Sequence, residues 1–278
     1  MIHLFHEVSS KCSKLVTQQY STSFSSAIKL LHTELRVPVY NIYGFVRFAD
    51  EIVDTFHEYD KELLLEKFKI ETFEAIKTGI SLNPILNSFQ STVNKYNINL
   101  ELINAFFESM EMDLYNTKYD VSGYSQYIYG SAEVVGLMCL YVFCEGNKDK
   151  YEHLKPSAQA LGAAFQKVNF LRDVKADFEQ LNRTYFPGID FKNFTQDMKQ
   201  RIEEDITRDF HDAYEGILQL PLKARFGVYV AYKYYLSLFN RIKKLHPAVL
   251  MEDRIRVPHY SKVFILMRAG LRSQLNIL

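Results

Sequence analysis

The feature that most restricts the fold of this chain is the spacing of its apolar residues, which recur at three- and four-residue steps along nearly its whole length. Strict alternation of apolar and polar residues over strand lengths is not found. The 278 residues include only 7 prolines and 11 glycines, so the chain is poor in the residues that interrupt sheets and mark loops. We therefore predict an all-α protein, built as a single bundle of about ten helices.

The clearest helix follows Pro38, which is placed as a proline near a helix start, and its apolar stripe runs from Val39 to Val53. The other helices are expected approximately at 22–33, 61–78, 84–96, 99–115, 124–145, 157–180, 196–219, 222–245 and 260–275. The breaks between them are turn-like, and none is long enough or low enough in complexity to be a linker. Residues 1–278 are therefore predicted to form one domain.

The charges of the chain are balanced, with 33 lysines and arginines against 33 aspartates and glutamates. No global field would attract nucleic acid or an anionic membrane, so a nucleic-acid partner is not expected and any charged ligand must be met by local clusters. The N-terminus lacks the apolar run of a signal peptide, and export is not expected. The longest apolar run, Val134–Cys144, is well short of the roughly 20 residues that span a bilayer and predicts a buried helix.

Common metal, redox and nucleotide motifs are missing from the sequence. Cys12, Cys139 and Cys144 form neither a CxxC pair nor an even set, which indicates a reducing cytoplasm rather than a disulfide framework or a zinc site. His3 and His6 have the spacing H-x-x-H beside Glu7, but we expect the terminus there to be frayed and to hold no metal. Nucleotide-binding glycine loops, the G-x-S-x-G elbow and the HExxH zinc motif are also absent.

The spacing D-x-x-x-D occurs twice, as Asp50 with Asp54 and as Asp173 with Asp177. Residues four apart on a helix lie on one face, about 6 Å from each other, so each pair aims two carboxylates in the same direction. Both pairs continue stripes that are expected to face inward. Magnesium takes oxygen ligands and typically uses one or two carboxylates together with substrate phosphates. Taken singly, either pair is better explained as surface charges, but the two pairs with their surroundings predict a diphosphate clamp that uses Mg²⁺, with Mn²⁺ as an alternative ion.

Basic, hydroxyl and aromatic residues surround the two pairs in the sequence. Arg47 lies one turn before Asp50, Arg172 adjoins Asp173, and both arginines could meet a diphosphate. Further candidates for the polar surroundings are Ser21, Ser23, Arg183, Tyr185, Arg254 and Arg256. An apolar wall that suits a prenyl chain is predicted from Phe24, Tyr43, Tyr127, Val135, Gly136, Leu161 and Phe165. A dry aromatic pocket can stabilise a carbocation through the ring quadrupoles; the alternative is that these residues are ordinary core.

These segments together resemble the squalene and phytoene synthases. The resemblance is carried, in order, by Tyr20-Ser21-Thr22-Ser23-Phe24, by Tyr43-x-x-x-Arg47-x-x-Asp50-Glu51-Ile52-Val53-Asp54, by Tyr127 with Ala132-x-x-Val135-Gly136, by Gln166-x-x-Asn169-x-x-Arg172-Asp173-x-x-x-Asp177 and by Arg183-x-Tyr185-Phe186. The order and the separations match across most of the chain. The resemblance implies an isoprenoid synthase fold, in which helices surround a central cavity and two prenyl diphosphates condense head to head.

The resemblance also implies roles for individual residues. The magnesium ligands would be Asp50, Asp54, Asn169, Asp173 and Asp177. The diphosphates would be held or oriented by Ser21, Ser23, Tyr43, Arg47, Arg172 and Tyr185, and Tyr127 and Gln166 would line the reaction centre. Phe24 and Arg183 are further predicted substrate-binding residues. Two departures from the family are visible: Glu51 stands where an aspartate is common, and Ser131-Ala132-Glu133 stands where many relatives have Val-Ala-Gly.

The expected reaction is that of bacterial phytoene synthases, which this chain resembles most. They join two geranylgeranyl diphosphates through a cyclopropyl intermediate, prephytoene diphosphate, in carotenoid biosynthesis and need no NADPH. We prefer this product because no dinucleotide fingerprint or C-terminal membrane anchor is evident in the sequence. Squalene or dehydrosqualene formation from farnesyl diphosphate is the alternative, and a non-catalytic assembly or binding homologue is the alternative of another class. Because substrate and product are greasy, we expect a cytoplasmic protein with a peripheral contact at the inner face of the cell membrane, and a hand-off to a downstream desaturase.

Overall fold

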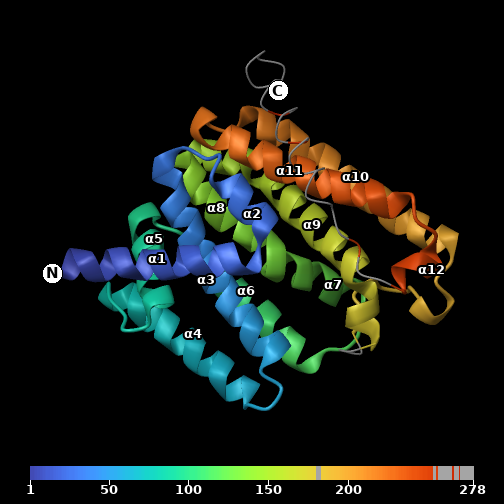
Figure 1. Cartoon of the computed structure of the whole chain (residues 1–278), viewed down its shortest axis with the longest axis horizontal. Helices are drawn as coiled ribbons and strands as arrows, with labels where there is room; N and C mark the ends of the chain where they lie inside the picture. The colour runs from blue at the N-terminus through green and yellow to red at the C-terminus, as the bar shows by residue number, and fades with distance from the viewer. Residues whose placement is uncertain (180–182, 253–254, 256–264, 266–268, 270–278) are drawn as a thin grey trace.

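The structure is a computed structural model that describes residues 1–179, 183–252, 255, 265 and 269. This part of the chain is helical, and its only β pairing is an isolated bridge between Lys118 and Thr184. Figure 1 shows the helices gathered into one bundle, with α10 and α11 along one edge and α4 at the opposite edge. The prediction of an all-α protein is confirmed.

The helical elements follow one another with short connections. They are α1 (Ile2–Tyr20), α2 (Thr22–Ile28), α3 (Thr33–Thr55), α4 (Lys61–Thr78), α5 (Pro84–Tyr96), α6 (Leu100–Tyr115), α7 (Val121–Ile128), the π-helix η1 (Tyr129–Glu133), α8 (Val134–Cys144), α9 (Lys148–Glu179), the 3-10 helix η2 (Phe191–Asn193), α10 (Gln196–Gln219), α11 (Leu222–Lys243) and α12 (Pro247–Leu250). Of the predicted helix at 260–275, only residues 265 and 269 are described, so that prediction lies outside the described residues.

The expectation of a frayed N-terminal end was wrong, because residues 2–20 form α1. The buried face of α1 consists of the small hydroxyl residues Ser9, Ser13 and Thr17, so its apolar periodicity gives no sign of burial. The Ser13 hydroxyl lies 2.6 Å from that of Ser88, and Gly44 on α3 lies so close that a Cβ there would be 2.7 Å from the Ser13 Oγ. Close approach and hydrogen bonds, rather than apolar burial, therefore fix α1 against α3 and α5.

Two prolines lie inside helices that begin earlier than predicted. Helix α3 starts at Thr33, not at Pro38, and α2 ends at Ile28 rather than continuing to residue 33. The missing N–H of Pro38 would have bonded the carbonyl of Glu34, which is exposed and can be hydrated instead. Likewise α9 begins at Lys148 and runs through Pro156, although the sequence predicted its start at residue 157.

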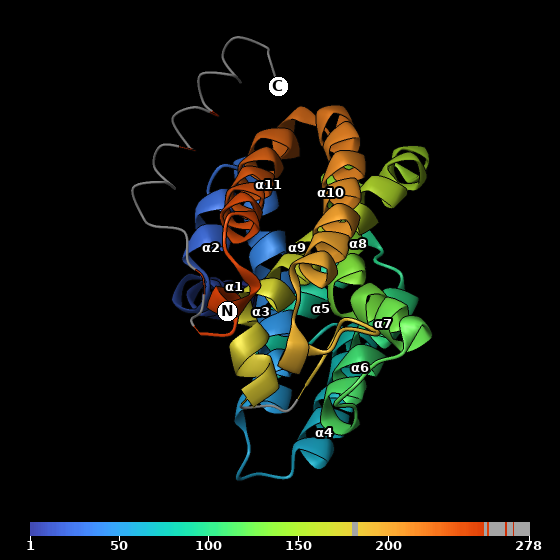
Figure 2. The ribbon, with the colours of Figure 1, turned by 90° about the vertical axis from the view of Figure 1, so that its right-hand side faces the viewer.

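Helix α3 separates an aromatic core from the functional half of the bundle. On its inner face Phe45 stacks on Phe89, with ring centroids 3.9 Å apart and an interplanar angle of 5°. Phe68, Phe106 and Phe107 complete this cluster from α4 and α6. The core fixes the rotation of α3 about its axis, so the polar residues of its other face point away from the cluster. Figure 2 shows α10 and α11 side by side at the end of the bundle remote from α4.

The most apolar helical stretch is Val121–Cys144, which combines α7, η1 and α8. By length and composition it could cross a membrane, but more than half of it is buried inside the bundle, as in a core helix. Helix α8 packs against α3, α6 and α9, so the predicted burial of the run 134–144 is confirmed. Gly130 in the π-helical turn lets this element approach α6, where a Cβ would lie 2.4 Å from the Ala105 carbonyl oxygen.

Candidate active site

A cavity of about 440 Å³ lies between α2, α3 and the helices α8 to α11. The polar part of the wall includes Ser21 at the start of α2, Ser131 of η1, Arg47 and Asp50 of α3, and Ser157, Gln166, Asn169 and Arg172 of α9. Apolar and small residues form the remainder, including Ile28, Leu31, Val39, Val135, Gly136, Phe143, Leu154, Leu161, Ala213, Gly216 and Leu220. The cavity is thus suited to a ligand with a charged head and a long hydrocarbon body.

The first aspartate motif lies at the end of α3, where carboxylates outnumber the cations near them. Arg47 pairs with Glu51 and lies 3.8 Å from Asp50 Oδ2. The Thr55 hydroxyl donates a 2.6 Å hydrogen bond to Glu51 Oε2 and so holds that carboxylate to one side. Burial, reinforced by the charge of Asp54 and opposed by Arg47, raises the pKa of Asp50 to about 7. The motif therefore gains from any additional positive charge.

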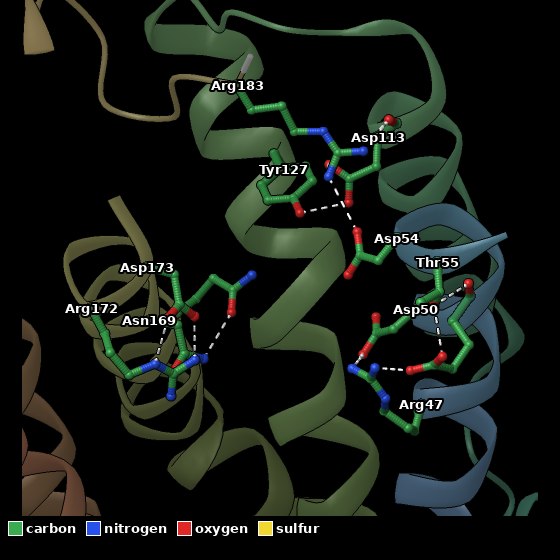
Figure 3. Close-up of polar contacts among 12 residues, drawn as sticks. Arg47, Asp50, Asp54, Thr55, Asp113, Tyr127, Asn169, Arg172, Asp173 and Arg183 are labelled. Carbon is green, nitrogen blue, oxygen red and sulfur yellow. Dashed lines mark hydrogen bonds and ion pairs between the residues drawn. The ribbon is translucent and has the colours of Figure 1, made fainter. Parts of the chain in front are cut away.

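The second motif lies on α9, on the opposite side of the space that Figure 3 shows. Arg172 binds Asp173 through two contacts, Nε to Oδ1 at 3.0 Å and Nη2 to Oδ2 at 2.5 Å. Asn169 Nδ2 donates to Gln166 Oε1 at 3.4 Å, and Gln166 in turn donates to Ser131 Oγ at 3.3 Å. Ser131, at a position where the sequence departs from the family, is thereby part of the hydrogen-bond chain that orients Asn169.

Two buried polar atoms at this end of the cavity have no hydrogen-bond partner in the described part of the chain. They are the acceptor Asn169 Oδ1 and the donor Arg47 Nε. Since buried polar atoms in proteins are normally satisfied, an acceptor and a donor left open together suit a ligand that brings both a cation and an anion.

The oxygen donors at this end suit a hard divalent cation. Asp50 and the open oxygen of Asn169 line the cavity, while Asp54 and Asp173, on the same two helices, are not among its wall residues. Carboxylate and amide oxygens of this kind are the ligand types that Mg²⁺ prefers. Among the described side chains, no three histidine, cysteine, aspartate or glutamate residues converge on a single point. A cation here would therefore use one or two carboxylates together with ligand oxygens, as magnesium commonly does. The side chain of Asp177, the remaining predicted ligand, lies outside the described residues.

Aromatic rings occupy the wall next to the polar end. Phe24 stacks on Tyr43 with centroids 5.2 Å apart, and Phe165 stacks on Tyr235 at 3.8 Å. Burial raises the pKa of Tyr43 to about 12, so its hydroxyl stays protonated. Tyr20 covers the guanidinium of Arg47 at 4.5 Å from the ring centroid. The sequence analysis did not single out Tyr235, whose signal is lost among the many tyrosines of α11.

The other predicted cavity residues divide into two groups. Ser21, Val135, Gly136, Leu161 and Gln166 line the cavity, and the Ser21 side chain also caps α2 by accepting a hydrogen bond from the Phe24 amide. Ser23, Tyr127, Arg183 and Tyr185 are not among its wall residues. Arg254 and Arg256 lie outside the described residues.

Arg183 and Tyr127 instead meet at Asp113, a buried carboxylate of α6. The Tyr127 hydroxyl donates a 2.7 Å hydrogen bond to Asp113 Oδ2. Arg183 donates to the Asp113 carbonyl at 2.6 Å and lies 3.3 Å from Asp54 Oδ1 (Figure 3). Burial raises the pKa of Asp113, whereas the adjacent Arg183 opposes the shift and favours the charged carboxylate. Arg183 thus links the first motif to a buried network rather than to the cavity itself.

Asp113 was missed by the sequence analysis. Its signal is an acidic residue on an otherwise apolar stripe, since Phe106, Met110 and Asp113 follow helical spacing on one buried face of α6. Glu133, at the other family departure, is half-buried and accepts a 2.8 Å hydrogen bond from Gln159. It is not a wall residue of the cavity, so it changes the packing behind the wall rather than the wall itself.

The arrangement of the whole chain matches that of known isoprenoid synthases. A crystal structure of a dehydrosqualene synthase in complex with ligand superimposes with a TM-score of 0.85 at 18% identity, over 97% of this chain and 98% of that one. The helical bundle around a cavity, with two aspartate motifs on opposite helices, thus has the all-α isoprenoid synthase fold.

Sequence comparison specifies the family. The squalene/phytoene synthase family model matches residues 17–261, and the chain belongs to that family. A phytoene synthase of Arthrospira platensis is 26% identical over 93% of this chain and 91% of its own length. A 4,4'-diapophytoene synthase of Staphylococcus haemolyticus (strain JCSC1435) is also 26% identical, over 70% of this chain and 67% of its own length. The names of these relatives support a prenyltransferase-type enzyme.

Proposed function

We propose that this protein is a phytoene synthase, which condenses two geranylgeranyl diphosphates head to head with Mg²⁺ and without NADPH. The observation that carries the proposal is the pair of open polar atoms, Asn169 Oδ1 and Arg47 Nε, at the polar end of a largely apolar cavity of about 440 Å³. One suits a cation and the other an anion, which is the combination that a magnesium diphosphate presents.

The polar residues of the site are proposed to bind the diphosphate group and its metal. Arg47 and Arg172 would donate hydrogen bonds to diphosphate oxygens, while Asp50, Asp54, Asn169 and Asp173 would hold the metal. Mg²⁺, when bound, would neutralise charge on the diphosphate and so make it a better leaving group. Arg172 must loosen its hold on Asp173 for this to occur, so substrate binding at the second motif exchanges one charge partner for another.

The first half-reaction forms a cyclopropane. The C1–O bond of one substrate breaks, and its diphosphate leaves with the bonding electrons. An alkene of the second substrate attacks the resulting allylic cation, and loss of a proton closes the three-membered ring. Tyr43 and Tyr235 line the cavity, and their rings can stabilise positive charge. The raised pKa of Tyr43 keeps its hydroxyl protonated, so it offers no ionised oxygen that could trap the cation.

The second half-reaction ionises this intermediate. Its own C–O bond breaks, the carbon skeleton rearranges, and loss of a second proton leaves a forty-carbon hydrocarbon with a central double bond. Because a proton is lost and no hydride is added, no reductant is required. The apolar wall keeps water from the cation until the proton has left.

A thirty-carbon product is the second candidate, and a specific comparison favours keeping it. The relative named 4,4'-diapophytoene synthase and the relative named phytoene synthase are equally identical to this chain, at 26%. Identity therefore does not choose between farnesyl and geranylgeranyl diphosphate as substrate.

The decisive experiment is an anaerobic incubation with Mg²⁺ and either geranylgeranyl or farnesyl diphosphate, with and without NADPH, followed by mass analysis of the organic extract. We expect a forty-carbon hydrocarbon from the longer substrate in the absence of NADPH. A thirty-carbon product alone would move the protein to the dehydrosqualene or squalene branch. No hydrocarbon from either substrate would favour a non-catalytic binding homologue.

A further inference from the structure

A short segment after α9 connects three helices that carry different parts of the site. Residues 183–186, here called the strap, run beside the α6–α7 connection, where the Thr184 amide donates a 2.8 Å hydrogen bond to the Thr117 carbonyl. Arg183 reaches Asp54 at the end of α3, while Tyr185 stacks on Phe170 of α9 with centroids 4.0 Å apart and an interplanar angle of 8°. The strap therefore contacts the helix of each aspartate motif.

Arg183 interacts more closely with Asp113 than with Asp54. Arg183 is 7% exposed, and the side chain of Asp113 is 4% exposed, whereas that of Asp54 is 43% exposed. Asp113 engages the guanidinium through both its carbonyl and its carboxylate, while Asp54 makes a single contact of 3.3 Å. Asp54 is thus oriented by Arg183 but keeps oxygen lone pairs for another cation.

Asp113 is in turn held from two sides by tyrosines. The Tyr127 hydroxyl donates at 2.7 Å to one carboxylate oxygen, and the Tyr119 hydroxyl lies 3.5 Å from the other. The rings of both tyrosines pack against Tyr185, so the orientation of Asp113 is set by the same cluster that holds the strap.

We propose that Asp113 is a positioning residue for the first aspartate motif: it holds Arg183 in place, and Arg183 orients Asp54 without neutralising it. This inference rests on the proposed metal-dependent function. It assigns to Tyr127 an indirect role, in which its hydroxyl fixes Asp113 and no contact with substrate is needed. If Asp113 loses its charge, Asp54 becomes the remaining carboxylate partner of Arg183 in this group. The guanidinium then competes with the metal for the oxygens of Asp54.

The test measures metal binding directly, without turnover. The full-length protein is titrated with Mn²⁺ in the presence of inorganic diphosphate, and free Mn²⁺ is followed by electron paramagnetic resonance. We expect Asp113→Asn to weaken Mn²⁺ binding about tenfold or more, as is typical when a residue that orients a metal ligand is changed. Unchanged Mn²⁺ affinity in a folded Asp113→Asn protein would overturn the proposal.

A double variant separates positioning from general damage. In Asp113→Asn/Arg183→Gln the competing charge is absent, so Mn²⁺ should bind at least about threefold more tightly than to Asp113→Asn alone. A residue that only supported the fold would show no such recovery. If the double variant binds no better than the single one, the charge competition does not exist and the proposal fails.

A matched control and a milder variant complete the design. Glu203, paired with Lys199 in α10, is a similarly buried carboxylate away from the cavity wall, so Glu203→Gln should lower the melting temperature and leave Mn²⁺ affinity unchanged. If Asp113→Asn does not fold, Tyr127→Phe decides, with an expected loss of about threefold in Mn²⁺ affinity from one hydrogen bond. Unaltered affinity in Tyr127→Phe would then overturn the proposal. Failure of the wild-type protein to bind Mn²⁺ with diphosphate would instead overturn the proposed function on which it rests.

Discussion

The two aspartate motifs share one sequence spacing but have different charge environments. In the first motif Asp50, whose side chain is 31% exposed, has the like charge of Asp54 nearby, and the neighbouring Arg47 is engaged mainly by Glu51. In the second motif Asp173 is held by two contacts from the arginine next to it. Sequence spacing therefore determines which carboxylates share a helix face. How closely each carboxylate is paired with an arginine depends on the side-chain contacts in the folded protein.

The largest effect on product formation is expected when one carboxylate is removed from either motif, since the two motifs should then prove equally necessary despite their different surroundings. Asp50→Ala and Asp173→Ala should each lower product formation by at least about 1000-fold, because each removes several kcal/mol of metal-assisted stabilisation of the departing diphosphate. The helical circular-dichroism signal should remain. Product is measured by mass analysis, with the exposed Glu58→Ala as a control that keeps activity. Turnover retained in both variants would refute the metal clamp.

A second prediction concerns the arginine partners and is read out as stability. Arg183→Gln leaves Asp113 buried without its cation and should lower the free energy of unfolding by about 3 kcal/mol. Arg172→Gln should cost only about 1 kcal/mol, because Arg172 and Asp173 are each about a fifth exposed and adjacent in sequence. Urea unfolding followed by circular dichroism measures both. Equal losses would mean that the second motif is as deeply tied into the fold as the first.

Much of the fold could be predicted because burial and helical periodicity coincide in most of the helices. In α3 the apolar spacing located the buried face, and Arg47 and Asp50 near the end of the helix line the cavity together with Val39, Tyr43 and Val46. Helix α1 shows the opposite case: its buried residues are serine and threonine, and its partners, such as Ser88, come from 75 residues further along the chain. Packing of that kind depends on the complementary surface and leaves no periodic signal.

The candidate site was predictable to the extent that its residues form local motifs. Asp50 and Asn169 lie in spaced sets on single helices, and both line the cavity. Asp113 belongs to no motif, and its partner Arg183 is 70 residues away. The predicted places of Tyr127 and Arg183 on the cavity wall differ from the structure for the same reason, because their orientation depends on this distant carboxylate.

A third prediction uses pH to sharpen the contrast between the motifs in metal-free protein. The pKa of Asp50 is raised from 3.8 to about 7, so between these values the folded chain keeps a proton that the unfolded chain has lost. The contribution of Asp50 to stability is therefore greatest below about pH 4 and is lost as the pH rises to about 7. At higher pH the folded chain must hold Asp50 in its charged form, which lowers stability. Asp50→Asn removes this charge, so the variant should be more stable than wild type by about 1–2 kcal/mol at pH 8, but not at pH 4.

The corresponding change in the second motif serves as the control. Asp173→Asn removes a carboxylate that Arg172 already binds, so it should gain no stability at pH 8. Urea unfolding in the presence of a chelator, at both pH values, measures the two variants against wild type. A stabilised Asp173→Asn protein would show that the two motifs are equally short of positive charge, contrary to the contacts in the structure.

The smallest expected effect tests Glu51, the departure from the family within the first motif. Glu51 now draws Arg47 toward itself with help from Thr55, which leaves Asp50 at 3.8 Å from the guanidinium. The shorter side chain in Glu51→Asp should release Arg47 toward Asp50 and change the KM for the prenyl diphosphate by about two- to threefold, with kcat nearly unchanged, as expected for a partly exposed ion pair. Steady-state kinetics measures both constants. A tenfold fall in kcat would instead give Glu51 a direct role at the metal, and the first motif would then differ from the second in the number of its ligands as well as in its charge balance.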